Sequence, residues 1–82
     1  MDKSKDIWIL ETKTYDGELV DREYLRTRER AVERAMEHID SEMPRSRRGR
    51  SQCLDECHEG LERHGHASDY YEYSITHEEF TE

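Results

Sequence analysis

The chain has 82 residues, which is the length of one domain with a thin hydrophobic core. Charged residues make up 41% of it and hydrophobic residues 32%, and the formal net charge of −8 opposes direct binding to nucleic acid or to anionic membranes. Such a composition approaches that of disordered chains, but the apolar residues are grouped in periodic segments. We therefore expect residues 1–82 to form a single small acidic α+β domain.

The charge is unevenly distributed along the chain. Residues 1–44 carry 12 acidic and 8 basic side chains, whereas residues 51–82 carry 9 acidic side chains and Arg63 alone. Between these two parts, residues 45–50 (RSRRGR) carry four arginines. The C-terminal part is therefore the most acidic, and the arginine-rich segment is the one local exception.

The residues predict a cytoplasmic protein without membrane contact. No apolar run approaches the ~20 residues that cross a bilayer. The apolar stretch 7–10 is too short for the hydrophobic part of a signal peptide. Cys53 and Cys57 form a poor disulfide framework, which agrees with a reducing compartment.

The first two predicted elements are strands joined by a tight turn. Residues 7–14 are rich in β-forming side chains, and residues 18–25 alternate imperfectly as a return strand. Between them, Asp16 and Gly17 supply the positive φ angles that hairpin turns require.

Two helices are predicted next. Thr27 is suited to cap the first helix, which ends at Met43 because the residue before proline disfavours helical geometry. Ser51 is expected to cap the second helix and Gly65 to end it. The first helix would bury one apolar stripe and the second a shorter one: Ala31, Val32, Ala35, Met36, Ile39 and Met43, then Leu54, Cys57, His58 and Leu61.

Residues 69–76 alternate as a third strand, with Tyr71, Tyr73 and Ile75 facing one way. The residues after 76 are expected to fray, apart from Phe80. The whole pattern predicts an α+β fold in the order β-β-α-α-β.

In this predicted fold, a three-stranded antiparallel or mixed sheet has the order 2-1-3, with the apolar first strand in the centre. Both helices pack on one face of the sheet, which buries their apolar stripes. The arginine-rich segment at 45–50 is then an exposed loop between the helices.

A cysteine–histidine cluster is the sharpest motif in the chain. Two thiols four residues apart share a helix face, and two histidines beyond the helix end would complete a tetrahedral zinc site. The spacing differs from that of common zinc motifs, so we favour two cysteines packed in the core, with no metal and no other cofactor. A disulfide between the two cysteines is a further alternative. The zinc alternative would use Cys53, Cys57, His64 and His66.

The RSRRGR segment has two interpretations. Its guanidinium groups would bind a phosphate or an acidic surface through forked hydrogen bonds, or they would neutralise nearby carboxylates within the chain. The segment contains no aromatic side chain to stack on bases and lies between acidic segments, so we do not favour a nucleic-acid contact. The arginines are Arg45, Arg47, Arg48 and Arg50.

Carboxylates form rows on both predicted helices. On the first helix Glu29, Glu33 and Glu37 lie four residues apart, but two of them are expected to pair at i,i+3 spacing, as Arg30–Glu33 and Arg34–Glu37. The second helix has only Arg63 against its carboxylates and is the better acidic surface, although a merely solvated face is the alternative.

The predicted partner-binding residues come from the second helix and from the start of the last strand. Alternation along that strand exposes one of its tyrosines, and tyrosine offers contact area at a low cost in entropy. Good strand composition is the other explanation for the tyrosines. The predicted set is Asp55, Glu56, Glu59, Glu62, Asp69, Tyr70 and Glu72.

We find no motif of a known catalytic site. The chain lacks G-x-S-x-G, a Walker loop, H-E-x-x-H and the glycine fingerprint of nucleotide-binding folds, and its four glycines are dispersed. A domain of two helices and three strands also offers little concave volume for a substrate. We therefore expect a protein that is not an enzyme.

The layout resembles small acidic proteins of bacteriophages and mobile elements, some of which are anti-CRISPR or other anti-defence proteins. The residues that carry the resemblance are W-I-L-E-x-x-x-x-D-G-E-L-V at 8–20, R-E-R-A-V-E-R-A-M at 28–36 and Y-Y-E-Y-S-I at 70–75. The resemblance implies a protein that binds a host effector and blocks its nucleic-acid site. Our leading hypothesis is therefore a binding protein that occupies a basic surface of a host protein. A zinc module and a homo-oligomeric structural protein, for example a homodimer, are the alternatives.

Overall fold

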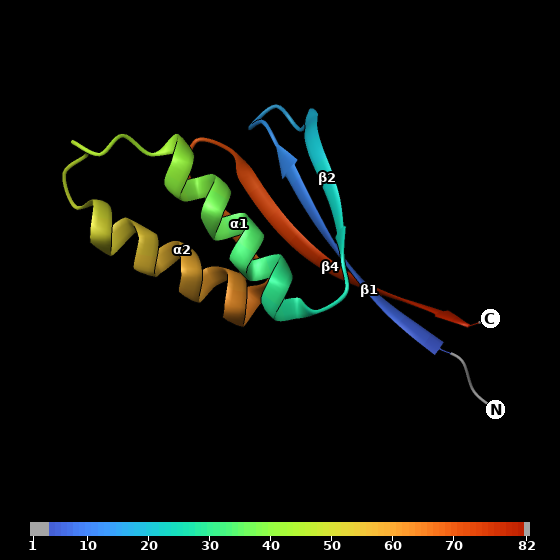
Figure 1. Ribbon diagram of the computed structural model, residues 1–82. Coiled ribbons are helices and arrows are strands. Elements are labelled where there is room, and N and C mark those ends of the chain that lie inside the picture. Colours follow the sequence, from blue (N-terminus) through green and yellow to red (C-terminus); the bar gives the residue numbers. More distant parts are fainter. Residues whose placement is uncertain (1–3, 82) are drawn as a thin grey trace.

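Across residues 4–81, the part of the chain that the computed structural model describes, two helices lie side by side on one face of a four-stranded sheet (Figure 1). Strands β1 and β4 continue beyond the helices as a long ribbon, in which Ser4 pairs with Thr81 at the tip. Neither helix in these residues has both the length and the apolar composition of a membrane span. The elements are β1 (Ser4–Lys13), β2 (Leu19–Leu25), α1 (Arg28–Glu42), α2 (Arg50–His64), β3 (His66–Ser68) and β4 (Glu72–Thr81).

The sheet has the strand order β2-β1-β4-β3, so the prediction of three strands in the order 2-1-3 is wrong by one strand. The additional strand, β3, has three residues and pairs with the start of β4 at the edge of the sheet. Three residues are too few to show an alternating pattern, so periodicity carries no signal for this strand. The α+β class is confirmed, and β1 lies between β2 and the last strand as expected.

The last strand begins and ends later than the predicted range 69–76. Asp69 and Tyr71 close a turn in which the Asp69 N–H donates to the Tyr71 carbonyl at 3.0 Å. Because of this turn, β4 begins at Glu72 rather than at residue 69. The residues after 76, which were expected to fray, instead pair in register with β1.

Side-chain contacts stabilise this unexpected part of the ribbon. The Trp8 and His77 rings stack with their centroids 4.4 Å apart, and His77 Nε2 lies 2.8 Å from an oxygen of Asp6. An aromatic pair directly opposite across two strands favours their pairing. The prediction for Phe80 concerned its side chain, which lies outside the described residues.

The hairpin and the first helix lie where they were predicted, but Gly17 alone gives the turn a positive φ (+89°), so the prediction of a positive φ at Asp16 is wrong. Thr14 N–H donates to the Glu18 carbonyl at 2.9 Å and closes the turn between β1 and β2. The Thr27 hydroxyl accepts a hydrogen bond from the Arg30 N–H at 3.1 Å, so Thr27 is the N-cap of α1. The helix ends where the Met43 N–H donates to the Ile39 carbonyl.

The second helix begins two residues earlier than predicted and without a side-chain cap. Its N-cap is Gly49, so the prediction that Ser51 caps this helix is wrong. Its end at Gly65 is confirmed: Gly65 has φ +75°, a left-handed conformation that residues with a Cβ rarely adopt. The Gly65 carbonyl accepts from the Ile75 N–H at 2.7 Å and ties the helix end to β4.

Arginines tie the two antiparallel helices together at both ends. The Arg28 guanidinium at the start of α1 donates to the Leu61 carbonyl at 3.0 Å and also to the Glu62 carbonyl. At the opposite end, the Arg50 guanidinium donates to the Asp40 carbonyl and carboxylate. These contacts link α1 and α2 near both ends of the pair.

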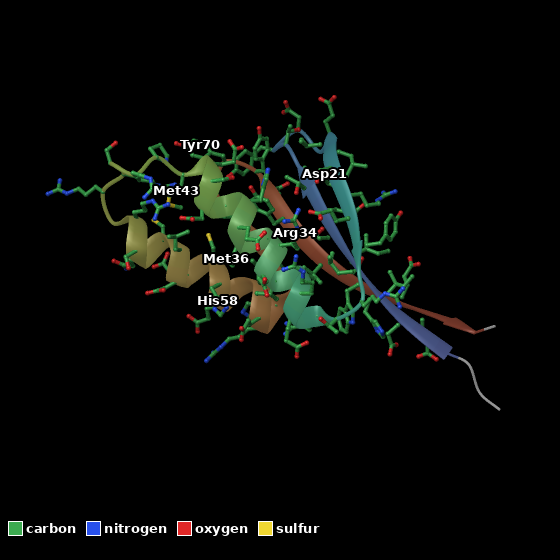
Figure 2. All side chains as sticks on the ribbon, in the orientation of Figure 1. Asp21, Arg34, Met36, Met43, His58 and Tyr70 are labelled. Atoms are coloured by element: carbon green, nitrogen blue, oxygen red, sulfur yellow. The ribbon has the colours of Figure 1, made fainter. Side chains whose placement is uncertain are left out.

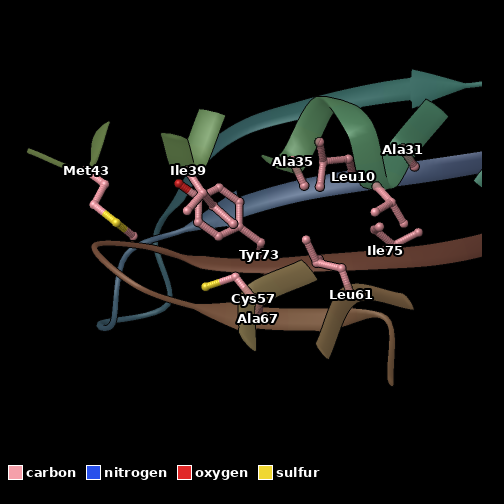
Figure 3. Packing of buried hydrophobic residues seen from close by; sticks show 11 residues of the cluster. Leu10, Ala31, Ala35, Ile39, Met43, Cys57, Leu61, Ala67, Tyr73 and Ile75 are labelled. Carbon is pink, nitrogen blue, oxygen red and sulfur yellow. The ribbon is translucent and has the colours of Figure 1, made fainter. Parts of the chain in front are cut away.

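The hydrophobic core lies between the helix pair and the inner face of the sheet (Figure 3). Tyr73 of β4 is almost completely buried, and its hydroxyl lies 2.7 Å from His38 Nδ1 on α1, which satisfies a polar atom inside the core. Met36 and Leu54 are only partly buried, at the margin of the core. The buried residues are Leu10, Ala31, Val32, Ala35, Ile39, Met43, Cys57, Leu61, Ala67, Tyr73 and Ile75.

Candidate protein-binding surface

All four predicted carboxylates of α2 are exposed. Glu59 lies 3.2 Å from Arg63 and Glu62 lies 3.1 Å from His58, both at i,i+4 spacing. No ion pair among the described side chains involves Asp55 or Glu56. Exposed pairs at this spacing contribute little free energy, so these carboxylates remain free to contact a partner.

The four carboxylates do not all face the same way around α2, because Glu62 and Glu56 lie toward different neighbours. Glu62 faces α1 and lines the space between the helices, together with Leu54 and His58. Glu56 faces the other way, toward β3, where Gly60 lies next to it. Asp55 and Glu59, one helical turn apart, lie between these two sides; we call this outermost side the crest of α2.

A groove with an acidic rim runs between the two helices. Its volume is about 550 Å³, and apolar side chains from α1 and α2 form its floor. The floor consists of Val32, which is buried, and of Met36 and Leu54, which are partly exposed (Figure 2). The rim consists of Glu29, Glu33, Glu37 and Asp40 from α1 and of His58 and Glu62 from α2.

Two arginines of α1 bind two carboxylates of this rim, Glu33 and Glu37, and Arg50 of α2 binds a third, Asp40. The two predicted i,i+3 contacts are confirmed: Arg30–Glu33 at 2.5 Å and Arg34–Glu37 at 2.7 Å. Arg34 also donates a hydrogen bond to Glu23 of β2 at 3.1 Å. This hydrogen bond is the largest cause of the raised pKa of Arg34, and the hydrogen bond to Glu37 is the second. No lysine or arginine lines the groove itself within the described residues.

The four arginines of the 45–50 segment do not form one exposed basic loop, so that prediction is wrong in part. Arg47 donates to the carboxylate of Asp69 at 2.5 Å, which raises the pKa of Arg47, and its guanidinium lies 6.0 Å from the centre of the Tyr70 ring. Arg50 belongs to α2 and pairs with Asp40. Neutralisation of carboxylates within the chain therefore occupies two of the arginines, and Arg45 and Arg48 are the exposed ones.

The three predicted binding residues near the start of β4 have different environments. The Asp69 side chain is only 9% exposed, because it binds Arg47 and its backbone carbonyl accepts from the Tyr15 hydroxyl. Asp69 thus joins three loops within the fold, and little of its side chain is left to contact a partner. Tyr70 is 50% exposed and Glu72 is exposed, so both remain available to a partner.

The structure does not bring together the four residues of the zinc alternative. Cys57 is buried against β3 with its Sγ 3.9 Å from the Ser68 carbonyl, and this burial raises the pKa of its thiol. His64, the last residue of α2, and His66, the first residue of β3, are exposed, and their ring centroids lie 5.9 Å apart in a stacked arrangement. Within residues 4–81, no three His, Cys, Asp or Glu side chains converge as ligands of a metal ion would. Both cysteines are thiols, and Cys53 is partly buried.

The sequence pattern does not predict the groove, because helical periodicity assigns the whole apolar stripe of each helix to the core. Met36 and Leu54 belong to these stripes but lie only partly inside, and this half-burial makes them floor residues. The separate acidic rows were visible, whereas their convergence depends on how the helices pack. Carboxylates around an apolar floor give this groove a negative potential above an apolar surface. Comparison of the chain with protein-family models, with curated proteins and with solved structures found no match.

Proposed function

We propose that this chain is a non-enzymatic binding protein that occupies a basic surface of a protein partner with α2. The observation that carries the proposal is the exposure of every carboxylate on this helix, two of which have no cationic partner among the described residues. A surface of one charge sign accelerates association with a surface of the opposite sign and selects against anionic partners. The partner therefore carries an excess of arginine and lysine at the contact.

The narrower form of the proposal is an inhibitor of the anti-CRISPR type. In it, the carboxylates of α2 lie where the phosphates of a nucleic acid would otherwise bind on the partner. The row Asp55, Glu59 and Glu62 extends over about 10 Å of helix, which is long enough to contact several basic side chains. The resemblance to small phage proteins supports this form, and it makes the partner a nucleic-acid-binding protein of the host.

A matched pair of charge variants tests the proposal. The triple variant Asp55→Asn, Glu56→Gln, Glu59→Gln neutralises α2 outside the groove. The control Asp16→Asn, Glu18→Gln, Asp21→Asn changes the net charge equally at the exposed hairpin.

Each tagged protein is used to capture partners from the organism that encodes it, at low and at high salt, with mass spectrometry of what is retained. We expect a basic protein that the unaltered chain and the hairpin control retain, and that the α2 variant and high salt release. Equal capture by both variants would contradict a role for α2.

A second candidate function is self-assembly, and the exposed edge of the sheet favours it. The edge strand β2 leaves Leu19 44%, Val20 48% and Tyr24 62% exposed. Natural proteins usually protect such an edge with charges, proline or another chain. A monomeric mass at high micromolar concentration in analytical ultracentrifugation would exclude this candidate, whereas a dimer that Val20→Lys dissociates would support it.

A further inference from the structure

We propose that the groove between α1 and α2 binds a basic amphipathic helix of the partner. This inference rests on the proposed function and specifies the chemistry of what is bound. It makes the groove, rather than the crest of α2, the part of the surface that distinguishes one basic partner from another.

The apolar floor is the first argument. Met36 and Leu54 are partly exposed next to the buried Val32, so apolar area remains uncovered between two helices that are linked near both ends. Methionine is unbranched and polarizable and adapts to differently shaped apolar partners. An apolar side chain of the partner that covers this floor is stabilised by the removal of its apolar surface from water.

The distribution of charge around the floor is the second argument. The α1 side of the groove carries Glu29, Glu33, Glu37 and Asp40, whereas the α2 side carries His58 and Glu62. The occupant therefore needs an apolar stripe with lysine or arginine concentrated along the flank that faces α1. The intramolecular partners of Glu33 and Glu37 are themselves substantially exposed, so their pairing is weak and a cation of the partner competes with it.

The shape of the groove is the third argument, and it favours a helix over an extended segment. The rim extends from Glu29 to Asp40 on α1, which is about 16 Å or three turns of helix. A helix presents an apolar stripe with basic residues beside it on one continuous face, at positions i, i+3, i+4 and i+7. An extended segment would turn alternate side chains away from the groove.

The experiment measures the affinity of a designed peptide of about 18 residues, with leucines at helical spacing and lysines beside them, by fluorescence anisotropy. Its control is a peptide of the same composition in which the leucines do not share a face. We expect the amphipathic peptide to bind the protein at least about 10-fold more tightly than its control.

Variants of the floor separate groove binding from general attraction between opposite charges. Met36→Glu and Leu54→Glu each add a negative charge, so general attraction predicts tighter binding of the basic peptide. Loss of the apolar floor predicts the opposite, and we expect the affinity to fall about 10-fold or more in each variant. Unchanged or tighter binding would overturn the proposal.

A measurement on the unaltered protein excludes the objection that a floor variant fails to fold. In methyl NMR spectra of methionine-labelled protein, the Met36 signal should shift as the peptide is added. The signal of Met43, which is 3% exposed, should not. Shifts of both signals or of neither would count against the groove.

The two proposals fail separately. Asp55, Glu56 and Glu59 do not line the groove, so their triple variant should change the affinity of the peptide by no more than about twofold. If that variant loses the host partner while the floor variants still bind the peptide, the proposed function stands and the groove proposal falls. The reverse result would retain the groove and remove the α2 surface from the function.

Discussion

The two sides of α2 differ in how closely they are packed. On one side, Gly60 lies against β3 so closely that a Cβ at this position would be 2.8 Å from the His66 carbonyl oxygen. On the other side, Leu54 and Met36 stay partly exposed between α2 and α1. The packed side determines where the helix lies, and therefore the open side can keep apolar surface for a partner without loss of the fold.

The same difference holds for charge. On the packed side, Arg47 and Asp69 neutralise each other next to Cys57 and β3. On the open side, carboxylates that are distant in the sequence, such as Glu29 and Glu62, meet at one rim. Ion pairs within the chain therefore occupy two arginines of the 45–50 segment. Carboxylates that are scattered along the sequence, by contrast, meet at the rim of the groove.

The largest expected effect is on the packed side, with Gly60→Val. The close approach to the backbone of His66 leaves no room for a branched side chain, so either α2 or β3 must move. Overpacking of this kind costs about 3 kcal/mol, and the variant should lose that much free energy of unfolding in urea titrations. Gln52→Ala, at an exposed position of the same helix, should change it by less than about 0.5 kcal/mol. If Gly60→Val were as stable as the unaltered protein, the two sides of α2 would not differ in how closely they are packed.

The open side should tolerate substitution far better. Met36→Ala and Leu54→Ala remove side chains that are already partly exposed, so each should cost about 1 kcal/mol, below the 2–5 kcal/mol typical of full burial. Leu61→Ala, at a completely buried position of the same helix, is the matched control and should fall in that higher range. Equal losses at Leu54 and Leu61 would mean that the floor of the groove is ordinary core.

The comparison also shows which parts of the structure the sequence could predict. Local signals sufficed for the hairpin, for the Thr27 cap and for the ends of both helices at Met43 and Gly65, because each depends on a few neighbouring residues. The i,i+3 ion pairs of α1 were predictable for the same reason. The start of α2 was not, because the preferred cap residue Ser51 lies inside a helix that begins after Gly49.

Features that depend on distant residues could not be predicted. The pairing of Arg47 with Asp69 joins segments 22 residues apart, and nothing local distinguishes Arg47 from Arg45 or Arg48. Helical periodicity shows which face of a helix is apolar, but it does not show how deeply each position is covered. The partial exposure of Met36, and with it the groove, follows only from the way the two helices pack.

The smallest expected effect concerns the two cysteines and leaves the fold intact. Burial raises the pKa of the Cys57 thiol, so at a given pH less of it is thiolate, the form that reacts with alkylating reagents. Cys53 is only partly buried, and it should react with iodoacetamide at pH 8 at least about 10-fold faster than Cys57, as measured by mass spectrometry of proteolytic fragments. The rate at Cys57 should keep rising at pH values above the usual pKa of a thiol, because its proton is released at higher pH. Under denaturing conditions the two thiols should become equal. Equal rates in the folded protein would show that the packed side opens readily, and would leave α2 without the fixed position on which the groove depends.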